Sequence, residues 1–327
     1  MKLEISTVAF SDESFSTTDE IVPYLVFAIG YEERSVYLVQ QLLSLISAKK
    51  ICPIVFLFID YAQTEQTASL LDLLSKLNVY PIPIAYNEHE KVINELKRLV
   101  SRDLAKKSMF HFDYSSMPRS WYCRFPEFII NHSHVIKKCF FWYTVGDYQP
   151  ISDGFPSTGV RDIRLFSGRP TLRPSNSRTH IFGLGFDHVR TQGIMSVLDP
   201  SYYGVCYAYP LGDKEILNKV QSENEELITS SNFNFELPLH DFEFMFSKLV
   251  DLSTSISNKG DVIFVPDGPK PLILACSLVP VMTARKGIVC LHVKRHDEFF
   301  EPINVKPKGT IYGFSFQYIT DNTSTES

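Results

Sequence analysis

The sequence predicts an α/β fold made of two similar units in tandem, and three observations lead to this prediction. Segments of the first half recur in the second half, in the same order and at a nearly constant spacing. Short apolar runs of strand length alternate with amphipathic stretches of helical length in both halves. The chain has 327 residues, of which 44% are hydrophobic and 21% charged, so it can bury two ordinary cores.

Three matched segments indicate the duplication. Residues 24–35, YLVFAIGYEERS, resemble residues 180–191, HIFGLGFDHVRT, and Gly30 aligns with Gly185 at an offset of 185 − 30 = 155. Residues 79–84, VYPIPI, resemble residues 233–239, FNFELPL. Residues 109–113, MFHFD, resemble residues 262–267, VIFVPD, so Asp113 aligns with Asp267 at 267 − 113 = 154. Each half then has a final predicted strand, at 138–144 and at 287–293.

Between these strands the first half carries amphipathic stretches, such as 36–47, 67–77 and 88–100. Strands that alternate with helices predict a mainly parallel sheet covered by helices on both faces and joined by right-handed crossovers. We therefore expect two tandem Rossmann-like units related by an internal pseudo-twofold duplication. We place the first unit at 1–146, a linker or inserted hairpin rich in Pro, Gly, Ser and Arg at 147–179, the second unit at 180–319, and a disordered tail at 320–327.

Composition narrows the class of protein. The formal net charge of -5 gives no global attraction to nucleic acid or to an anionic membrane. The N-terminal residues do not resemble a signal peptide, and no apolar run approaches the roughly 18 residues of a membrane helix. The six cysteines lie far apart without a C-x-x-C pair, which is typical of reduced, buried thiols. These features predict a cytoplasmic protein with no membrane partner.

The candidate site residues lie where the predicted strands end. In open parallel sheets, ligands bind beyond the carboxyl ends of the strands, where helix N-termini present unpaired N–H groups. Gly30 and Gly185 close the first strand of each unit, and Arg34 and Arg190 follow in the first helical turn, where a guanidinium suits a phosphate or carboxylate. The residues that we predict to bind a ligand are Gly30, Glu32, Arg34, Ser35, Asp113, Ser115, Ser116, Arg119, Gly185, Asp187, Arg190, Thr191, Asp267, Gly268 and Lys270.

Each of these positions also has a structural alternative. The glycines can serve turn geometry alone, and the arginines can form ion pairs with neighbouring acids. The strand-end aspartates can contact a ribose hydroxyl or cap the following helices, and the serines can donate to phosphate or act as caps. Because Arg119 and Lys270 follow the aspartates, four basic side chains could converge on a symmetric polyanion. The arginines of the segment 161–178 could contact nucleic acid or belong to a solvated connection.

Known catalytic and cofactor motifs are missing from the sequence. The segment GLGFDH at 183–188 departs from the dinucleotide fingerprint at its third glycine, and no Walker A, G-x-S-x-G or H-E-x-x-H pattern occurs. His132 and His134 alternate beside Cys139, but solvated loop residues are the better interpretation than a metal site. We therefore predict no catalytic residue, no metal and no cofactor.

The pattern resembles the CRISPR-associated Rossmann-fold (CARF) sensor domains and the related SAVED domains, over about residues 20 to 315. The resemblance is architectural and rests on the strings at 30–35, 185–191, 113–119 and 267–270. The strings are also similar to those of proteins from bacterial defence islands. The resemblance implies a pocket between the two units for a cyclic or linear oligonucleotide, with Arg34, Arg190, Arg119 and Lys270 on phosphates. The chain shows no effector domain, so a partner protein would carry the output.

Three hypotheses follow for function. The first is a ligand-sensing or adaptor protein of bacterial antiviral defence, which binds a nucleotide-type or other phosphorylated ligand. The second is an enzyme that acts on a nucleotide or nucleic acid through strand-end carboxylates, and carboxylates clustered in one pocket would favour it. The third is a structural subunit of a defence complex, and large aromatic side chains filling the strand-end clefts would favour that one.

Overall fold

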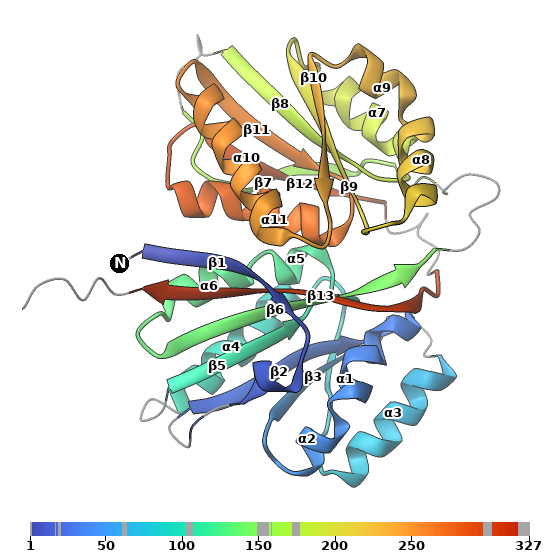
Figure 1. Cartoon of the computed structure of the whole chain (residues 1–327), viewed down its shortest axis with the longest axis vertical. Helices are drawn as coiled ribbons and strands as arrows, with labels where there is room; N and C mark the ends of the chain where they lie inside the picture. The colour runs from blue at the N-terminus through green and yellow to red at the C-terminus, as the bar shows by residue number, and fades with distance from the viewer. Residues whose placement is uncertain are drawn as a thin grey trace, which may run out of the picture. The chain divides into compact units, whose positions relative to one another are not determined.

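The computed structural model describes residues 2–16, 18, 21–60, 64–102, 107–148, 157, 159–171, 177–296 and 303–319. The chain divides into two compact units: Met1–Gln149 together with Pro302–Ser327, and Pro150–Glu301. Both units alternate strands and helices around a mainly parallel sheet, which confirms the predicted α/β class of two tandem Rossmann-like units (Figure 1). The tail that we expected to be disordered, 320–327, lies outside the described residues.

The first unit holds a sheet of seven described strands in the order β1-β13-β6-β5-β2-β3-β4. The strands from β6 to β4 in this order pair in parallel, whereas β13 is antiparallel to both β6 and β1. The elements of this unit are β1 (Lys2–Ala9), η1 (Asp12–Phe15), β2 (Ile21–Ile29), η2 (Glu33–Val36), α1 (Tyr37–Gln41), α2 (Leu43–Ser47), β3 (Cys52–Phe58), α3 (Glu65–Lys76), β4 (Ile82–Ile84), α4 (His89–Arg102), β5 (Lys107–Asp113), α5 (Arg119–Tyr122), α6 (Phe125–Asn131), β6 (Ile136–Asp147) and β13 (Lys306–Ile319).

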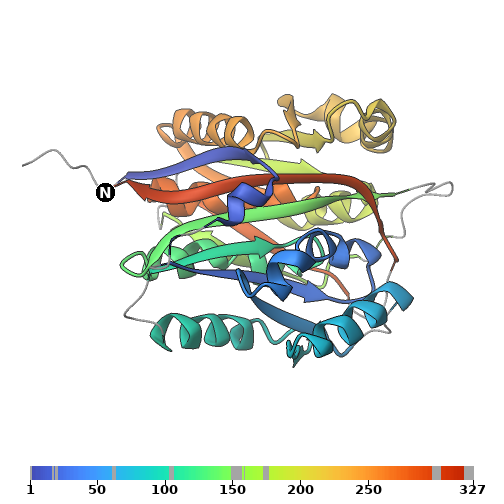
Figure 2. The same ribbon diagram turned by 60° about the horizontal axis from the view of Figure 1, so that its bottom comes forward.

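Apolar side chains on both faces of this sheet form its core. On one face, residues of η2, α1, α2 and α3 pack against β2, β5 and β6, with Phe27 and Trp142 fully buried. On the other face, α6 packs through stacked aromatic rings, since the Phe125 ring lies 4.4 Å from that of Phe112. Figure 2 shows the helices of the first unit on both sides of its sheet. The predicted helix at 36–47 is interrupted at Leu42, and the other two stretches form α3 and α4.

The second unit holds six described strands in the order β10-β9-β8-β11-β12-β7, and only β7 is antiparallel to its neighbour. Residues of α7, α8 and α9 pack on one face around Phe182 and Val205. The helices α10 and α11 contact each other and the strand β11. The elements are β7 (Asp162–Gly168), β8 (Ser177–Leu184), α7 (His188–Leu198), β9 (Tyr203–Tyr209), α8 (Lys214–Glu223), α9 (Glu225–Ser230), β10 (Phe233–Pro238), α10 (Phe242–Ser257), β11 (Gly260–Pro266), α11 (Lys270–Thr283) and β12 (Ile288–Lys294).

Two segments differ from the expected domain layout. We placed residues 306–319 in the second unit, but they form β13, which lies between β1 and β6 in the first sheet. We expected 147–179 to be a linker or hairpin, yet it contains β7, the last strand of the second sheet. Both segments were misplaced for the same physical reason. The strand β13 pairs antiparallel with β6, and β7 pairs antiparallel with β12, although the two partners in each pair are distant in sequence.

Candidate functional site

The two strand-end glycines are required by close packing. A Cβ atom at Gly30 would lie 2.8 Å from Cδ2 of Phe58. A Cβ atom at Gly185 would lie 2.8 Å from the backbone oxygen of Asp267, and one at Gly268 would lie 2.5 Å from that of Leu184. The turns after β8 and β11 therefore pack backbone to backbone, at the point where open α/β sheets otherwise bind ligands. In the second unit, this observation supports the structural alternative for the glycines.

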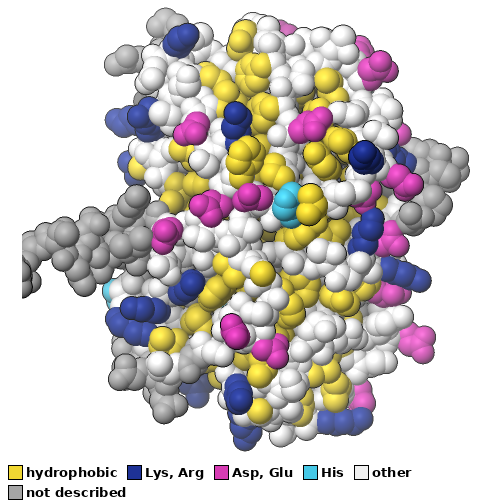
Figure 3. Space-filling view, in the orientation of Figure 1, with side chains coloured by type: hydrophobic (Ala, Val, Ile, Leu, Met, Phe, Trp, Pro, Cys, Tyr) yellow, Lys and Arg dark blue, Asp and Glu magenta, His cyan; other side chains and the backbone are white. Residues whose placement is uncertain are grey.

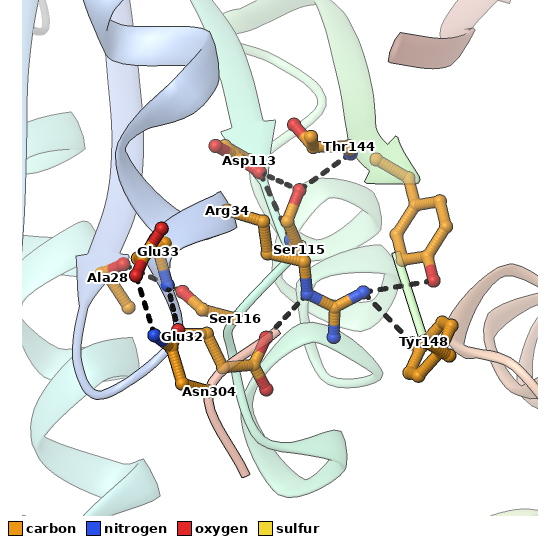
Figure 4. Close-up of polar contacts among 11 residues, drawn as sticks. Ala28, Glu32, Glu33, Arg34, Asp113, Ser115, Ser116, Thr144, Tyr148 and Asn304 are labelled. Carbon is orange, nitrogen blue, oxygen red and sulfur yellow. Dashed lines mark hydrogen bonds and ion pairs between the residues drawn. The ribbon is translucent and has the colours of Figure 1, made fainter. Parts of the chain in front are cut away.

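In the first unit, Arg34 is the centre of a buried polar cluster (Figure 4). Its Nε donates to the Glu32 carboxylate over 2.5 Å, and its Nη1 donates to the hydroxyls of Tyr143 and Tyr148 over 3.2 and 3.1 Å. Burial by itself would lower the pKa of Arg34, but Glu32 and the two tyrosines hold it well above its usual value. Arg34 is thus a permanent cation that already has one carboxylate partner.

A chain of hydrogen bonds fixes the turn after β5. One oxygen of Asp113 accepts from the backbone N–H of Ser115 over 3.0 Å and also from the Ser115 hydroxyl. The Ser115 hydroxyl accepts from the N–H of Thr144 over 2.8 Å, and the Ser116 hydroxyl donates to the Ala28 carbonyl over 2.7 Å. These contacts tie the turn to β6 and β2, as Figure 4 shows.

Of the alternatives for Asp113, Asp267 and the two serines, the structure contradicts the one in which they cap the following helices. The helix α5 begins after Pro118 without any side-chain cap, so neither Asp113 nor the two serines cap it. The helix α11 likewise begins after Pro269 without a side-chain cap, so Asp267 does not cap it. The N-cap residues Pro118 and Pro269 have no side-chain oxygen that could accept from a helix N–H. The carboxylates of Asp113 and Asp267 bind Ser115 and Arg190 instead.

Three buried hydroxyls of the first unit have no hydrogen-bond partner within the part of the chain that the structure describes. They belong to Ser35 in η2, Thr144 in β6 and Tyr122 in α5, whose residues are at most 1% exposed. The Nη2 atom of Arg34 also has no hydrogen bond to the described residues, whereas Nε and Nη1 do. A buried hydroxyl without a partner costs about 1–3 kcal/mol, which makes these groups candidate ligand contacts.

The segment that precedes β13 holds the backbone of η2 in place. The N–H of Glu33 donates to the side-chain oxygen of Asn304 over 2.9 Å, and the Asn304 amide donates back to the Glu33 carboxylate over 2.6 Å. The N–H of Arg34 donates to the carbonyl of Val305 over 3.0 Å. Two backbone donors at the start of η2 are thereby satisfied, so the loop that carries Arg34 is fixed by residues distant in sequence.

The second unit arranges the equivalent residues differently. Asp187 caps α7 by accepting from the N–H of Arg190 over 2.9 Å, and the Thr191 hydroxyl donates to the Asp187 carbonyl over 3.3 Å. The Arg190 guanidinium binds both oxygens of Asp267, with Nε at 2.8 Å from Oδ2 and Nη2 on Oδ1. Arg190 and Asp267 are both buried, so this is a closed two-point ion pair.

The difference between the units has a local cause. Glu32 is one methylene longer than Asp187 and reaches the guanidinium two residues ahead, whereas Asp187 is short enough to accept from the helix N–H. Arg190 therefore pairs with Asp267, which directly follows β11. In the first unit, Asp113 accepts from Ser115 instead. Both arginines are ion-paired inside their own units, as the structural alternative held, and Arg119 and Lys270 are half-buried at the starts of α5 and α11.

Several residues of the cluster were missed by the sequence analysis. Tyr143, Thr144 and Tyr148 lie on or just after β6, and Asn304 precedes β13. The first-unit sequence carries a weak signal for Tyr143 and Thr144, because they end the last predicted strand of the unit, 138–144, at the same sheet edge. Nothing local marks Asn304, since its partner Glu33 is 271 positions away.

Outside these two sites, the observations concern the charges on one face of the molecule (Figure 3) and the metal-binding side chains of the described residues. On the face drawn in Figure 3, Lys and Arg side chains lie scattered among acidic ones. Among the described residues, no three His, Cys, Asp or Glu side chains gather to hold a metal ion. Of the arginines at 161–178, Arg164 pairs with Asp162 and Arg173 lies outside the described residues. No described helix has both the length and the apolar character needed to cross a membrane.

Comparisons with known proteins complete these observations. No protein-family model matches the chain, and no curated protein matches its sequence. The candidate site is therefore defined by its geometry: one buried cluster around Arg34 in the first unit, and one closed ion pair around Arg190 in the second.

Proposed function

We propose that the chain is a ligand-binding adaptor whose first unit binds a nucleotide-type, phosphorylated ligand at the Arg34 cluster. One observation supports this most directly: the Nη2 atom of Arg34 and the buried hydroxyls of Ser35 and Thr144 have no partner among the described residues. All three groups belong to elements at the carboxyl edge of the first sheet, and η2 contacts β6.

The chemistry of the cluster suits a ligand with both acceptor and donor groups. A guanidinium N–H and hydroxyl groups donate well to phosphate oxygens, and such charge-assisted bonds are the stronger kind. The carboxylates of Glu32 and Asp113 lie in the same cluster and would repel a bare anion. They favour a ligand that also presents a hydroxyl donor, as the ribose of a nucleotide does.

The second unit contrasts with the first, and this supports a division of roles. To release Arg190 for a ligand, the ion pair with Asp267 must break, and the loss of one partner of a buried pair costs about 3–5 kcal/mol. Arg34 needs no such exchange, because Nη2 makes no bond to the described residues. We assign ligand binding to the first unit and a structural or partner-binding role to the second. The resemblance to CARF and SAVED sensors supports the same class, and the placement in antiviral defence rests on that resemblance.

A structural-subunit role is the second candidate, and one observation favours it. Buried tyrosines accumulate beside Arg34: the ring of Tyr114 lies 5.7 Å from that of Tyr143 and 5.3 Å from that of Tyr122. Aromatic side chains thus occupy much of the strand-end region, as this hypothesis requires. The enzyme hypothesis has less support, because Glu32 and Asp267 are both engaged by arginines.

Thermal-shift measurements on the full chain test the proposal. The ligands are mononucleotides, cyclic di- and trinucleotides and short oligonucleotides. A ligand at a hundred times its Kd stabilises the protein by roughly 2.7 kcal/mol. Ser35→Ala and Thr144→Val are expected to abolish the ligand-induced shift while leaving the ligand-free protein at least as stable as the wild type, because each removes a buried hydroxyl without a partner.

The matched control is Thr191→Val, which changes the equivalent position of the second unit and should leave the ligand-induced shift intact. If no ligand gives a saturable shift, the ligand-binding proposal is wrong and the structural-subunit candidate replaces it. If Thr191→Val abolishes a shift that Ser35→Ala preserves, the ligand binds the second unit.

A further inference from the structure

The strands β13 and β7 occupy the same position, one in the first sheet and one in the second. In the first sheet, Cys139 of β6 pairs in register with Phe110 on one side and Phe316 of β13 on the other. In the second sheet, Cys290 of β12 pairs with Phe264 on one side and Ser167 of β7 on the other. Counted from β4 in the first sheet and from β10 in the second, β13 and β7 are the sixth strands, and each is antiparallel to the fifth. The strands β7 and β13 are therefore structural equivalents.

Spacing along the chain gives the same equivalence. Cys139 and Cys290 are 290 − 139 = 151 residues apart, and Ser167 and Phe316 are 316 − 167 = 149 apart. The strand β7 follows β6 by 167 − 139 = 28 residues, and β13 follows β12 by 316 − 290 = 26. Each repeat thus encodes five parallel strands and then a sixth, and each sixth strand lies in the sheet of the other repeat.

We propose that the two repeats have exchanged their sixth strands, so that neither sheet is completed by its own repeat. The first sheet receives β13 from the second repeat, and the second sheet receives β7 from the first. The exchange is reciprocal, and the chain passes between the units twice, near Gln149 and near Glu301. This inference concerns chain connectivity and stands apart from the proposed ligand.

Each incoming strand also brings a short strap to the carboxyl edge of the sheet that it enters. Before β13, the strap Ile303–Val305 binds the backbone of η2 through Asn304 and Val305. Before β7, the N–H of Arg161 donates to the carbonyl of Lys294 over 2.9 Å, and the partly buried Val160 packs against the core of the second unit. The Arg34 cluster is therefore built by both repeats, since the first repeat alone lacks the residues that fix η2.

A single cut in the full-length chain tests the exchange. A protease recognition sequence is inserted between Gln149 and Pro150, and the protein is cleaved after folding. The cut leaves β13 on the piece that starts at 150, while its strand partners β1 and β6 remain on the piece 1–149. The two pieces are therefore expected to stay together on a resin that holds an N-terminal tag, because β13 pairs along both of its edges in the first sheet.

Two alanine variants distinguish the exchanged strand from any other association. In the cut protein, Phe314→Ala removes a ring that stacks on Phe141 at 4.8 Å and is expected to speed release of the untagged piece about 100- to 1,000-fold. Ile163→Ala in β7 is the matched control, because β7 and β12 stay on the same piece after the cut, and it should leave the release rate unchanged.

Circular dichroism before cleavage shows whether each variant is folded. The proposal is overturned if the pieces of the cut wild-type protein separate at once, if Phe314→Ala leaves the release rate unchanged, or if Ile163→Ala speeds release as strongly as Phe314→Ala.

Discussion

His111 makes the stability of the first unit depend on pH. Its ring is buried in β5 and stacks with the rings of Phe15 at 4.1 Å and Phe140 at 4.7 Å, and its Nδ1 accepts from the indole N–H of Trp142 over 3.2 Å. Burial, with a smaller contribution from the charge of Lys138, lowers the pKa of His111 from 6.5 to about 3. The folded protein therefore keeps this ring neutral throughout the mildly acidic range.

The sign of the effect follows from the two protonation states. Below pH 6.5 the unfolded chain binds a proton at His111 that the folded chain does not bind until about pH 3, so the free energy of unfolding falls as the pH falls. At 1.36 kcal/mol per pKa unit, this single group removes about 2 kcal/mol between pH 7.5 and pH 5.0. The loss would approach about 5 kcal/mol near pH 3.

Urea unfolding followed by tryptophan fluorescence measures this loss. Both tryptophans of the chain, Trp121 and Trp142, lie in the first unit, so the signal reports that unit. His111→Phe is expected to unfold more easily at pH 7.5, because the Trp142 indole loses its acceptor, but to lack the extra loss of about 2 kcal/mol at pH 5.0. His134→Gln, at an exposed histidine of the same unit, is the control and should keep the wild-type pH dependence. Equal pH dependence in wild type and His111→Phe would refute the reasoning.

Two further predictions concern the second unit. Arg190→Gln should lower the free energy of unfolding by about 3–5 kcal/mol, and combining it with Asp267→Asn should recover part of that loss. Thermal unfolding of the single and double variants measures both effects, and additive effects would contradict a direct ion pair. Gly185→Ala should destabilise the protein by about 1–3 kcal/mol, because its Cβ would meet a backbone oxygen. Gly193→Ala inside α7 should stabilise the protein by about 0.5–1 kcal/mol, because the nearest atom to that Cβ lies 3.7 Å away. Chemical denaturation compares the two variants, and equal effects would count against the packing argument.

The sequence predicted the parallel core of both sheets because that part is encoded locally. The apolar runs at 24–30, 109–113, 180–185 and 262–267 became β2, β5, β8 and β11, since a strand buried on both faces needs a continuous apolar run. The outer antiparallel strands were harder to place. Residues 306–319 were read as part of the second unit because strand partners are not written in the strand itself.

The predicted site residues lie at the carboxyl edges of the two sheets, but the contacts that they make there were not predicted. Arg34 and Arg190 were expected to be available for phosphates, and the structure pairs each with a carboxylate of its own unit. Which acid does the pairing depends on one methylene, Glu32 against Asp187, and on whether the following segment forms a regular helix. Such choices depend on side-chain reach in three dimensions, which residue spacing alone does not give.

The position of β13 also sets the order in which the two units can be completed on the ribosome. The second unit has all its described strands once Lys294 is made, because β7 is synthesised early, whereas the first unit must wait for β13, which begins at Lys306. From the end of β6 at Asp147 the wait is 306 − 147 = 159 residues, or about 8–32 s at the usual rate of about 5–20 residues per second. Throughout this time the edge of β6, with its apolar run 140–143, lacks its neighbour, and unprotected edges of this kind invite aggregation. The N-terminal half of this chain is thus the half that depends longest on protection during synthesis, the reverse of the usual order for tandem domains.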